Sequence, residues 1–307
     1  MKEVTPEESL DSWDLTHRRK IQNHPCYDPR AQHKYGRIHL PTAPRCNIQC
    51  NYCIRDFDCL HESRPGVTSR VLTPHEALAR LEEVMEMAPW IKVIGIAGPG
   101  DPLANDETFE TLELARAKFP HLMECLSTNG LVLLDQMDRL QALDVSHLTV
   151  TLNAIDPQIG HEIVSWVHYN GKTITGLEGA SLLISQQLSG IRQAVEKGIL
   201  VKVNTVYIPG VNDHHISAVA EKARELGVSM QNILPLLPQY RLDYLQAPDV
   251  SELKAIQEIC SHIIPQMHHC RQCRADAVGK LGEDQSYQFC QKEEQQPDRC
   301  SQKKSLS

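Results

Sequence analysis

Three cysteines, Cys46, Cys50 and Cys53, stand close together in the segment CNIQCNYC. Three thiolates at this spacing can wrap one face of a [4Fe–4S] cube, whereas most cluster proteins supply four cysteines. The missing fourth ligand leaves one iron open, as catalytic metal sites leave one position open. Such an iron can take the amino and carboxylate groups of S-adenosylmethionine (SAM), and an electron passed through the cluster then cleaves a carbon–sulfur bond of the sulfonium. The alternative for these residues is a structural zinc knuckle or chance clustering.

The whole chain is rich in possible ligands, with 11 cysteines and 15 histidines in 307 residues. Its polar N-terminal sequence lacks the apolar core of a secretory signal, so we expect a cytoplasmic protein. In a reducing compartment, clustered cysteines more often hold metal ions or iron–sulfur clusters than disulfides.

Composition excludes several function classes. Apolar residues make up 41% of the chain and charged residues 23%, which excludes wholesale disorder. The 31 basic and 39 acidic residues give a net charge of −8, which argues against a nucleic-acid-binding face. No apolar run reaches the roughly 18 residues of a membrane span, so neither nucleic acid nor a membrane is an expected partner.

Short apolar runs alternate with helical patterns from about Arg37 onward. The predicted strands have the β-branched content of buried parallel strands and cover Arg37–Thr42, Ile91–Ala97, Leu122–Ser127, His147–Asn153, Leu200–Tyr207 and Met230–Leu237. The predicted helices cover Pro74–Ala88 (N-cap Thr73), Glu107–Lys118, Leu133–Leu143, Ser181–Lys197 and His214–Leu226. Six repeats predict an α/β fold, a partial (β/α)6 barrel, with a doubly wound sheet as the alternative.

Two segments flank the predicted barrel, which spans residues 37–265. Residues 1–36 form a polar arm that contains His24 and Cys26. Residues 266–307 form an extension with the Cys270-x-x-Cys273 pair, and from about Glu283 it is expected to be a loose tail.

Polar and glycine-rich segments follow the predicted strands, at the end where barrel enzymes place their sites. Glycines after the second strand let the backbone approach a ligand closely, and hydroxyls and amides after the next two strands can hydrogen-bond a ribose or a carboxylate. The candidate cofactor-binding residues are Gly98, Gly100, Asp101, Ser127, Thr128, Asn129, Thr151 and Asn153. The alternative is that the polar members are ordinary turn formers.

The three-cysteine motif after the first strand, together with these segments, resembles the radical SAM superfamily, in which the glycine-rich turn faces the amino group of SAM. A common family version of this turn ends in Glu where this chain has Asp101, which leaves the role of that side chain open. More narrowly, the chain resembles the stand-alone form of the NifB family of nitrogenase cofactor maturation proteins over roughly residues 20–282. The motifs are His24-Pro25-Cys26, Cys46–Cys53, Asp58-Cys59, Glu62–Val67, Gly98–Leu103, Asn153–Pro157 and Cys270-x-x-Cys273.

The resemblance implies a radical SAM enzyme of nitrogen fixation. It would fuse two [4Fe–4S] clusters with a SAM-derived carbide and a further sulfide into an eight-iron precursor, NifB-co. One SAM would methylate a cluster sulfide, and a second would give the 5′-deoxyadenosyl radical that takes hydrogen from that methyl group. The implied cofactors are the three-cysteine cluster, SAM on its open iron, and two further [4Fe–4S] substrate clusters.

The resemblance also implies ligands for the two substrate clusters, and their division between the clusters stays open. The candidates are Cys59, Cys125, Cys270 and Cys273, together with His24 and Cys26. Because Pro25 biases His24 toward an extended backbone, the side chains of His24 and Cys26 are expected to reach one cluster. The alternatives are that Cys125 is a core residue and His24 a turn residue.

Five further residues were considered as site residues and are not among the predicted cluster ligands. Glu62 and Arg64 are candidate catalytic residues, with a surface ion pair as the alternative. Cys260 repeats with apolar residues on one helical face and is predicted to be core. Cys290 and Cys300 lie in the predicted tail and are expected to be bystanders.

The implied partners are an iron–sulfur cluster donor protein, an electron donor such as ferredoxin or flavodoxin, and a cofactor scaffold or carrier protein. Two other functions stay open. One is a radical SAM enzyme that modifies a small molecule or peptide with auxiliary electron-transfer clusters. The other is an iron–sulfur carrier that cleaves no SAM.

Overall fold

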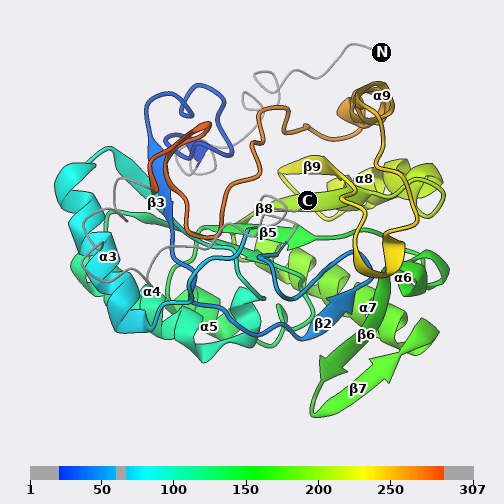
Figure 1. Cartoon of the computed structure of the whole chain (residues 1–307), viewed down its shortest axis with the longest axis horizontal. Helices are drawn as coiled ribbons and strands as arrows, with labels where there is room; N and C mark the ends of the chain where they lie inside the picture. The colour runs from blue at the N-terminus through cyan, green and yellow to red at the C-terminus, as the bar shows by residue number, and fades with distance from the viewer. Residues whose placement is uncertain (1–20, 60–66, 287–307) are drawn as a thin grey trace.

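Six parallel strands form the main sheet of the computed structural model, which describes residues 21–59 and 67–286 (Figure 1). In sheet order they are β1 (Gly36–His39), β3 (Ile91–Ile96), β4 (Met123–Thr128), β5 (His147–Thr151), β8 (Leu200–Tyr207) and β9 (Met230–Pro235). Sheet order follows chain order, and β9 ends the sheet at one edge. The predicted partial barrel is confirmed, because a doubly wound sheet would reverse its strand order at a switch point.

Helices cover the outside of this sheet (Figure 1). They are α3 (Pro74–Met87), α4 (Asp106–Lys118), α5 (Met137–Ala142), α7 (Gly176–Glu196), α8 (Ile216–Glu225) and α9 (Val250–Ser261), with short 3-10 turns at η1 (Pro102–Ala104), η2 (Asp213–His215) and η3 (Tyr240–Leu242). The N-cap predicted at Thr73 is confirmed. The Thr73 hydroxyl accepts the Glu76 backbone N–H, and the Glu76 carboxylate accepts the Thr73 backbone N–H, which is a capping box. None of the described helices combines the length and the apolar character that crossing a bilayer requires.

A second, three-stranded sheet was not predicted. It consists of β2 (Ile48–Cys50), β6 (Val164–Tyr169) and β7 (Lys172–Thr175), which pair antiparallel, and α6 (Pro157–Ile163) leads into it. Cys50 pairs with Val164 in this sheet, and the His168 N–H donates to the Asn47 carbonyl at 2.7 Å. The second sheet therefore fixes the backbone of the three-cysteine segment.

The C-terminal extension adds two strands to the main sheet. β10 (Val278–Lys280) pairs antiparallel with β1, and β11 (Glu283–Asp284) pairs with β10. The prediction of a loose tail from Glu283 is therefore wrong for Glu283 and Asp284, because the β10 backbone supplies a partner that composition alone does not reveal. Residues 287–307, with Cys290 and Cys300, lie outside the described residues.

The N-terminal arm packs against the strands of the barrel. The Tyr27 hydroxyl lies 3.1 Å from the Leu148 carbonyl and 3.4 Å from the Leu200 carbonyl, on β5 and β8. Tyr27 also shares an apolar cluster with Ile21 and Met267, so the arm and the C-terminal extension meet at this place. The arm is thereby held where its His24 and Cys26 face the barrel interior.

Candidate functional site

Cys46, Cys50 and Cys53 line one cavity of about 430 Å³, here called the triad cavity. Cys50 and Cys53 are 5% and 6% exposed, and the Cys53 N–H donates to the Cys50 carbonyl at 3.1 Å. The Gln49 side-chain amide donates to the carbonyls of Cys50 (3.0 Å) and Cys53 (2.8 Å). The segment is thus a tied loop that presents three thiols to one space.

Burial raises the pKa of all three thiols, since desolvation disfavours the thiolate. The Arg55 guanidinium opposes this rise, and it lines the same cavity. Among the described residues, no three His, Cys, Asp or Glu side chains are arranged to hold a single metal ion. In a cube each cysteine binds its own iron, so this donor set fits a [4Fe–4S] cluster better than a zinc knuckle.

The glycine-rich turn after β3 docks against the segment that leads into the triad. A Cβ built on Gly100 would lie 2.2 Å from the Arg45 carbonyl oxygen, so only glycine fits there. The Asp101 N–H donates to that same carbonyl at 2.8 Å. At Gly98, φ is +149°, and a Cβ there would lie 3.9 Å from the Cys59 Cβ. The turn is therefore built for close backbone approach.

Asp101 ties this turn to the end of β4. Its carboxylate accepts from the Thr128 hydroxyl (3.0 Å) and from the backbone N–H groups of Asn129 (2.6 Å) and Leu103 (2.9 Å). Burial raises the pKa of Asp101 to about 6, although these hydrogen bonds oppose the rise. Asp101 and Thr128 therefore position the strand ends, which is a role that spacing alone does not reveal.

Asn129 and Thr151 lie where the triad cavity meets a side cavity of about 390 Å³, and Asn153 lines that side cavity. Asn129 Nδ2 lies 3.6 Å from Cys46 Sγ, and Asn153 Nδ2 donates to the Tyr52 hydroxyl at 2.8 Å. Thr151 lines both cavities, and its buried hydroxyl has no hydrogen-bond partner among the described residues. An orphaned hydroxyl at this junction fits a polar ligand that spans the two cavities.

Five of the six further ligand candidates line another cavity, of about 580 Å³, here called the second cavity; they are His24, Cys26, Cys125, Cys270 and Cys273. Ala97 and Ser127 line both this cavity and the triad cavity, so the two adjoin inside the barrel. Cys59 lines the triad cavity instead. The structure therefore separates Cys59 from the other candidates.

His24 is 1% exposed, and its Nδ1 accepts the Cys26 backbone N–H at 3.2 Å. Its Nε2 is buried and has no partner among the described residues. Burial, with His147 and Lys202 nearby, holds the pKa of His24 well below its usual range, so the ring is neutral. The Tyr27 N–H donates to the His24 carbonyl at 3.0 Å, so a turn, rather than the expected extended segment, carries His24 and Cys26.

The second cavity is also lined by residues that were not predicted, among them Arg37, His39 and Lys202. His39 Nδ1 lies 2.9 Å from the Arg274 carbonyl, which fixes the proton on Nδ1, and burial lowers the pKa of His39 to about 4. The available signal was a charged or polar residue inside each of the apolar runs GRIHL and LVKVNTV.

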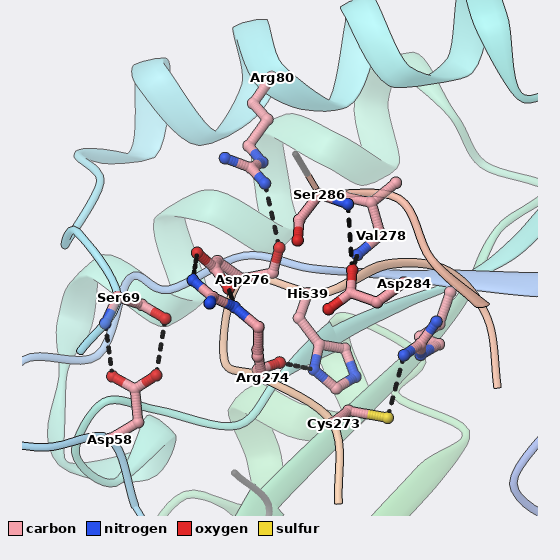
Figure 2. A network of polar contacts seen from close by, with 11 residues as sticks. His39, Asp58, Ser69, Arg80, Cys273, Arg274, Asp276, Val278, Asp284 and Ser286 are labelled. Carbon is pink, nitrogen blue, oxygen red and sulfur yellow. Dashed lines mark hydrogen bonds and ion pairs between the residues drawn. The ribbon is translucent and has the colours of Figure 1, made fainter. Parts of the chain in front are cut away.

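Figure 2 shows how the loop around Cys273 is held. Cys273 Sγ lies 3.1 Å from an Arg37 nitrogen, and the Arg274 guanidinium pairs with Asp276 at 2.7 Å. Arg80 of α3 donates to the Asp276 carbonyl at 3.0 Å. The loop is thus anchored to β1 and α3 at the wall of the second cavity.

The remaining candidates stand as follows. Glu62 and Arg64 lie outside the described residues. Cys260 is fully buried in the main apolar core, as predicted. Cys125 lies in the middle of β4, and it lines the second cavity.

Comparison with known proteins identifies the family. The radical SAM superfamily matches residues 40–223. FeMo cofactor biosynthesis protein NifB of Klebsiella pneumoniae is 48% identical over 279 residues, covering 89% of this chain and 60% of that protein. NifB of Chlorobaculum tepidum is also 48% identical, covering 86% and 63%. The chain thus spans about three fifths of the length of these two curated relatives.

A shorter relative is matched over most of its length. NifB of Methanocaldococcus jannaschii is 48% identical over 263 residues, covering 85% of this chain and 87% of that protein. Among solved structures, Streptococcus suis SuiB bound to S-adenosylmethionine has a TM-score of 0.54 at 13% identity, covering 74% of this chain and 47% of SuiB, which supports the fold alone. The chain belongs to the radical SAM superfamily and, within it, to the NifB family.

Proposed function

We propose that this protein is a radical SAM enzyme that assembles the eight-iron precursor of the nitrogenase cofactor. It would fuse two [4Fe–4S] clusters with a SAM-derived carbide and an additional sulfide. The observation that carries the proposal is the pair of adjoining cavities. One presents three thiols, and the other presents His24, Cys26, Cys125, Cys270 and Cys273.

The triad cavity is the proposed SAM site. Cys46, Cys50 and Cys53 would hold a [4Fe–4S] cluster, which when bound supplies the electron that cleaves SAM and yields a carbon radical. Asn129 and Thr151 face the ligand with an amide and an unpaired hydroxyl, as a small polar molecule requires. Gly100 and Ser127 line the same space, Asn153 lines the adjoining side cavity, and Gly98 lies in the turn that leads to Gly100. Asp101 and Thr128 hold the strand ends in register.

The second cavity is the proposed site of the substrate clusters. Its ligands come from the N-terminal arm, β4 and the C-terminal extension, and His24 among them is buried. His24 would bind iron through its unpartnered Nε2, which requires the proton to move to Nδ1 and the contact with the Cys26 N–H to break. Cys59, beside the triad, would bind a cluster on the side that faces SAM.

The expected partners follow from this chemistry. An iron–sulfur cluster donor must deliver the cubes, ferredoxin or flavodoxin must supply electrons, and a scaffold or carrier protein must receive the product. Clusters of this kind are exchanged in a reducing cytoplasm, so that is the proposed compartment.

The decisive experiment is anaerobic reconstitution with iron and sulfide, followed by SAM and a reductant. We expect 5′-deoxyadenosine and an eight-iron species that leaves the protein. If 5′-deoxyadenosine forms while all auxiliary iron stays bound, the enzyme instead modifies a small molecule or peptide. If no SAM is cleaved, the protein is an iron–sulfur carrier.

A further inference from the structure

His39 is the last residue of β1 and lines the second cavity, where it is 9% exposed. Arg37 lies two residues earlier on the same strand and lines the same cavity. This agrees with the alternation of side chains along a strand, which directs residues two apart to one face. The inner face of β1 therefore carries His39 to the cavity that contains most of the candidate cluster ligands.

One ring nitrogen of His39 is already engaged. Nδ1 lies 2.9 Å from the Arg274 carbonyl oxygen, and Figure 2 shows this contact. Because a carbonyl oxygen only accepts, the ring proton lies on Nδ1, and Nε2 carries a lone pair. Among the described residues, Nε2 has no hydrogen-bond partner. His39 thus offers one unshared electron pair.

The carbonyl that orients His39 belongs to an anchored loop. The Arg274 guanidinium pairs with Asp276 at 2.7 Å, and Arg80 of α3 donates to the Asp276 carbonyl at 3.0 Å (Figure 2). The backbone N–H of His39 donates to the Ala277 carbonyl of the same loop at 2.8 Å. Histidines that bind metals usually donate their other ring N–H to a carbonyl or carboxylate, which fixes the tautomer and the orientation of the ring. His39 has this arrangement.

Strand β3 leaves room for the free edge of the ring. His39 pairs with Gly95 in the register of β1 and β3, and Gly95 also lines the second cavity. A Cβ built on Gly95 would lie 2.5 Å from His39 Cδ2 and 2.8 Å from His39 Nε2. A glycine inside a strand weakens the strand and often marks a close approach. Here it is the approach of the ring edge that carries Nε2.

His24 lines the same cavity, but its proton lies on the opposite nitrogen. His24 Nδ1 accepts the Cys26 N–H at 3.2 Å, so the ring must exchange its proton and break this contact before Nε2 can bind iron. His39 needs no such rearrangement. Burial, with Arg37 nearby, lowers the pKa of His39 to about 4, so its ring is neutral at pH 7. Of these two imidazoles, His39 is the one already prepared to bind a metal.

The candidate ligands named so far are fewer than the irons of two [4Fe–4S] clusters. In a cube each ligand binds its own iron, so the ligands need not converge on one point as they do around a single ion. We propose that His39 binds one iron of a substrate cluster in the second cavity through Nε2, while its proton stays on Nδ1. This inference rests on the proposed function.

The test uses the full chain, labelled with ¹⁵N-histidine and reconstituted anaerobically with iron and sulfide before SAM is added. Pulsed EPR detects histidine nitrogen coupled to an auxiliary cluster. In His24→Ala we expect such a coupling to persist, because His39 still supplies it. In His24→Ala/His39→Asn we expect it to vanish.

His39→Asn separates a ligand from a structural histidine. Its side-chain amide can still donate to the Arg274 carbonyl, but it has no atom at the position of Nε2. We expect a chelator to remove auxiliary iron from His39→Asn about tenfold faster than from the wild type. His121→Asn is the matched control, since His121 is exposed and lines none of the three cavities, and it should change neither quantity.

Wild-type iron retention and histidine coupling in His39→Asn would overturn the inference, because a purely structural histidine is replaced well by asparagine. If His39→Asn does not fold, His24→Ala decides. Loss of all histidine coupling from His24→Ala while auxiliary iron stays bound would also overturn the inference. A wild-type protein that cleaves SAM but binds no auxiliary cluster would overturn the proposed function instead, so the two failures are distinguishable.

Discussion

The two cavities of the barrel gather their ligands in different ways. The triad cavity takes Cys46, Cys50 and Cys53 from one tied loop, whose amide contacts fix the backbone. The second cavity takes its candidate ligands from the arm, from β4 and from the C-terminal extension. A cluster held by one rigid loop is suited to stay, whereas a cluster held by separate segments can be released as each segment shifts.

Their positions in the barrel differ as well. Thr128 and Thr151, which line the triad cavity, are the last residues of β4 and β5. Cys125 and Lys202, which line the second cavity, lie near the middle of β4 and the start of β8. Under the proposed function, a radical formed at the strand ends would have its substrate in the adjoining cavity, across the wall shared at Ser127.

The largest expected effect tests the triad. Cys46→Ala, Cys50→Ala or Cys53→Ala should each abolish 5′-deoxyadenosine formation, because a cube with two protein ligands is not retained. Cys260→Ala is the matched control, since Cys260 is buried like Cys50 and Cys53 but belongs to the main apolar core. Chromatography of the quenched reaction gives the readout. Undiminished 5′-deoxyadenosine formation in any triad variant would show that this loop does not hold the catalytic cluster.

The next effect tests the separation of the two cavities. The double variant Cys270→Ala/Cys273→Ala should lose up to about four iron atoms per chain, one cube, while the triad keeps cleaving SAM. Iron analysis and 5′-deoxyadenosine yield measure the two cavities independently. A normal yield of the eight-iron product from this variant would mean that Cys270 and Cys273 bind no substrate cluster that the reaction needs.

Features that neighbouring residues encode could be predicted from the sequence, whereas features that depend on distant parts of the chain could not. The six strands and the triad were predictable, because β-branched runs and close cysteine spacing are local signals. The β2–β6–β7 sheet was missed because β2 has three residues and β7 is largely exposed, so neither shows an apolar pattern. β10 was missed because its partner, β1, lies far away in the chain.

The division of the ligands was beyond sequence reasoning for the same physical reason. Cys59 follows the triad closely in sequence, but closeness in sequence does not tell which cavity its side chain lines. The folded chain shows that Cys59 lines the triad cavity. Arg37 and Lys202 are single charges in apolar strands, which sequence alone cannot distinguish from solvent-exposed residues. Only the tertiary structure shows which cavity each of these residues lines.

A smaller effect tests how the triad cavity is held together. Burial raises the pKa of Asp101 to about 6 from 3.8, so between these values the folded protein holds a proton that the unfolded chain has released. Stability therefore falls as pH rises through this window, by up to about 3 kcal/mol at roughly 1.4 kcal/mol per pKa unit. In Asp101→Asn, whose amide does not titrate, the free energy of unfolding should lack this fall between pH 4 and pH 6. Denaturant unfolding between pH 4 and pH 7 measures it, and identical slopes for both proteins would contradict it.

The smallest expected effect distinguishes a ligand-binding hydroxyl from an idle one. Thr151 and Thr108 are both buried, and both hydroxyls lack a hydrogen-bond partner among the described residues, but only Thr151 lines the triad cavity. If Thr151 donates to SAM, Thr151→Val should weaken SAM binding by about tenfold, the equivalent of one net hydrogen bond. Thr108→Val should leave SAM binding unchanged, because Thr108 in α4 lines neither the triad cavity nor its side cavity. Equilibrium binding of SAM to the reconstituted protein is the measurement. Equal affinities for the two variants would mean that the Thr151 hydroxyl does not contact SAM.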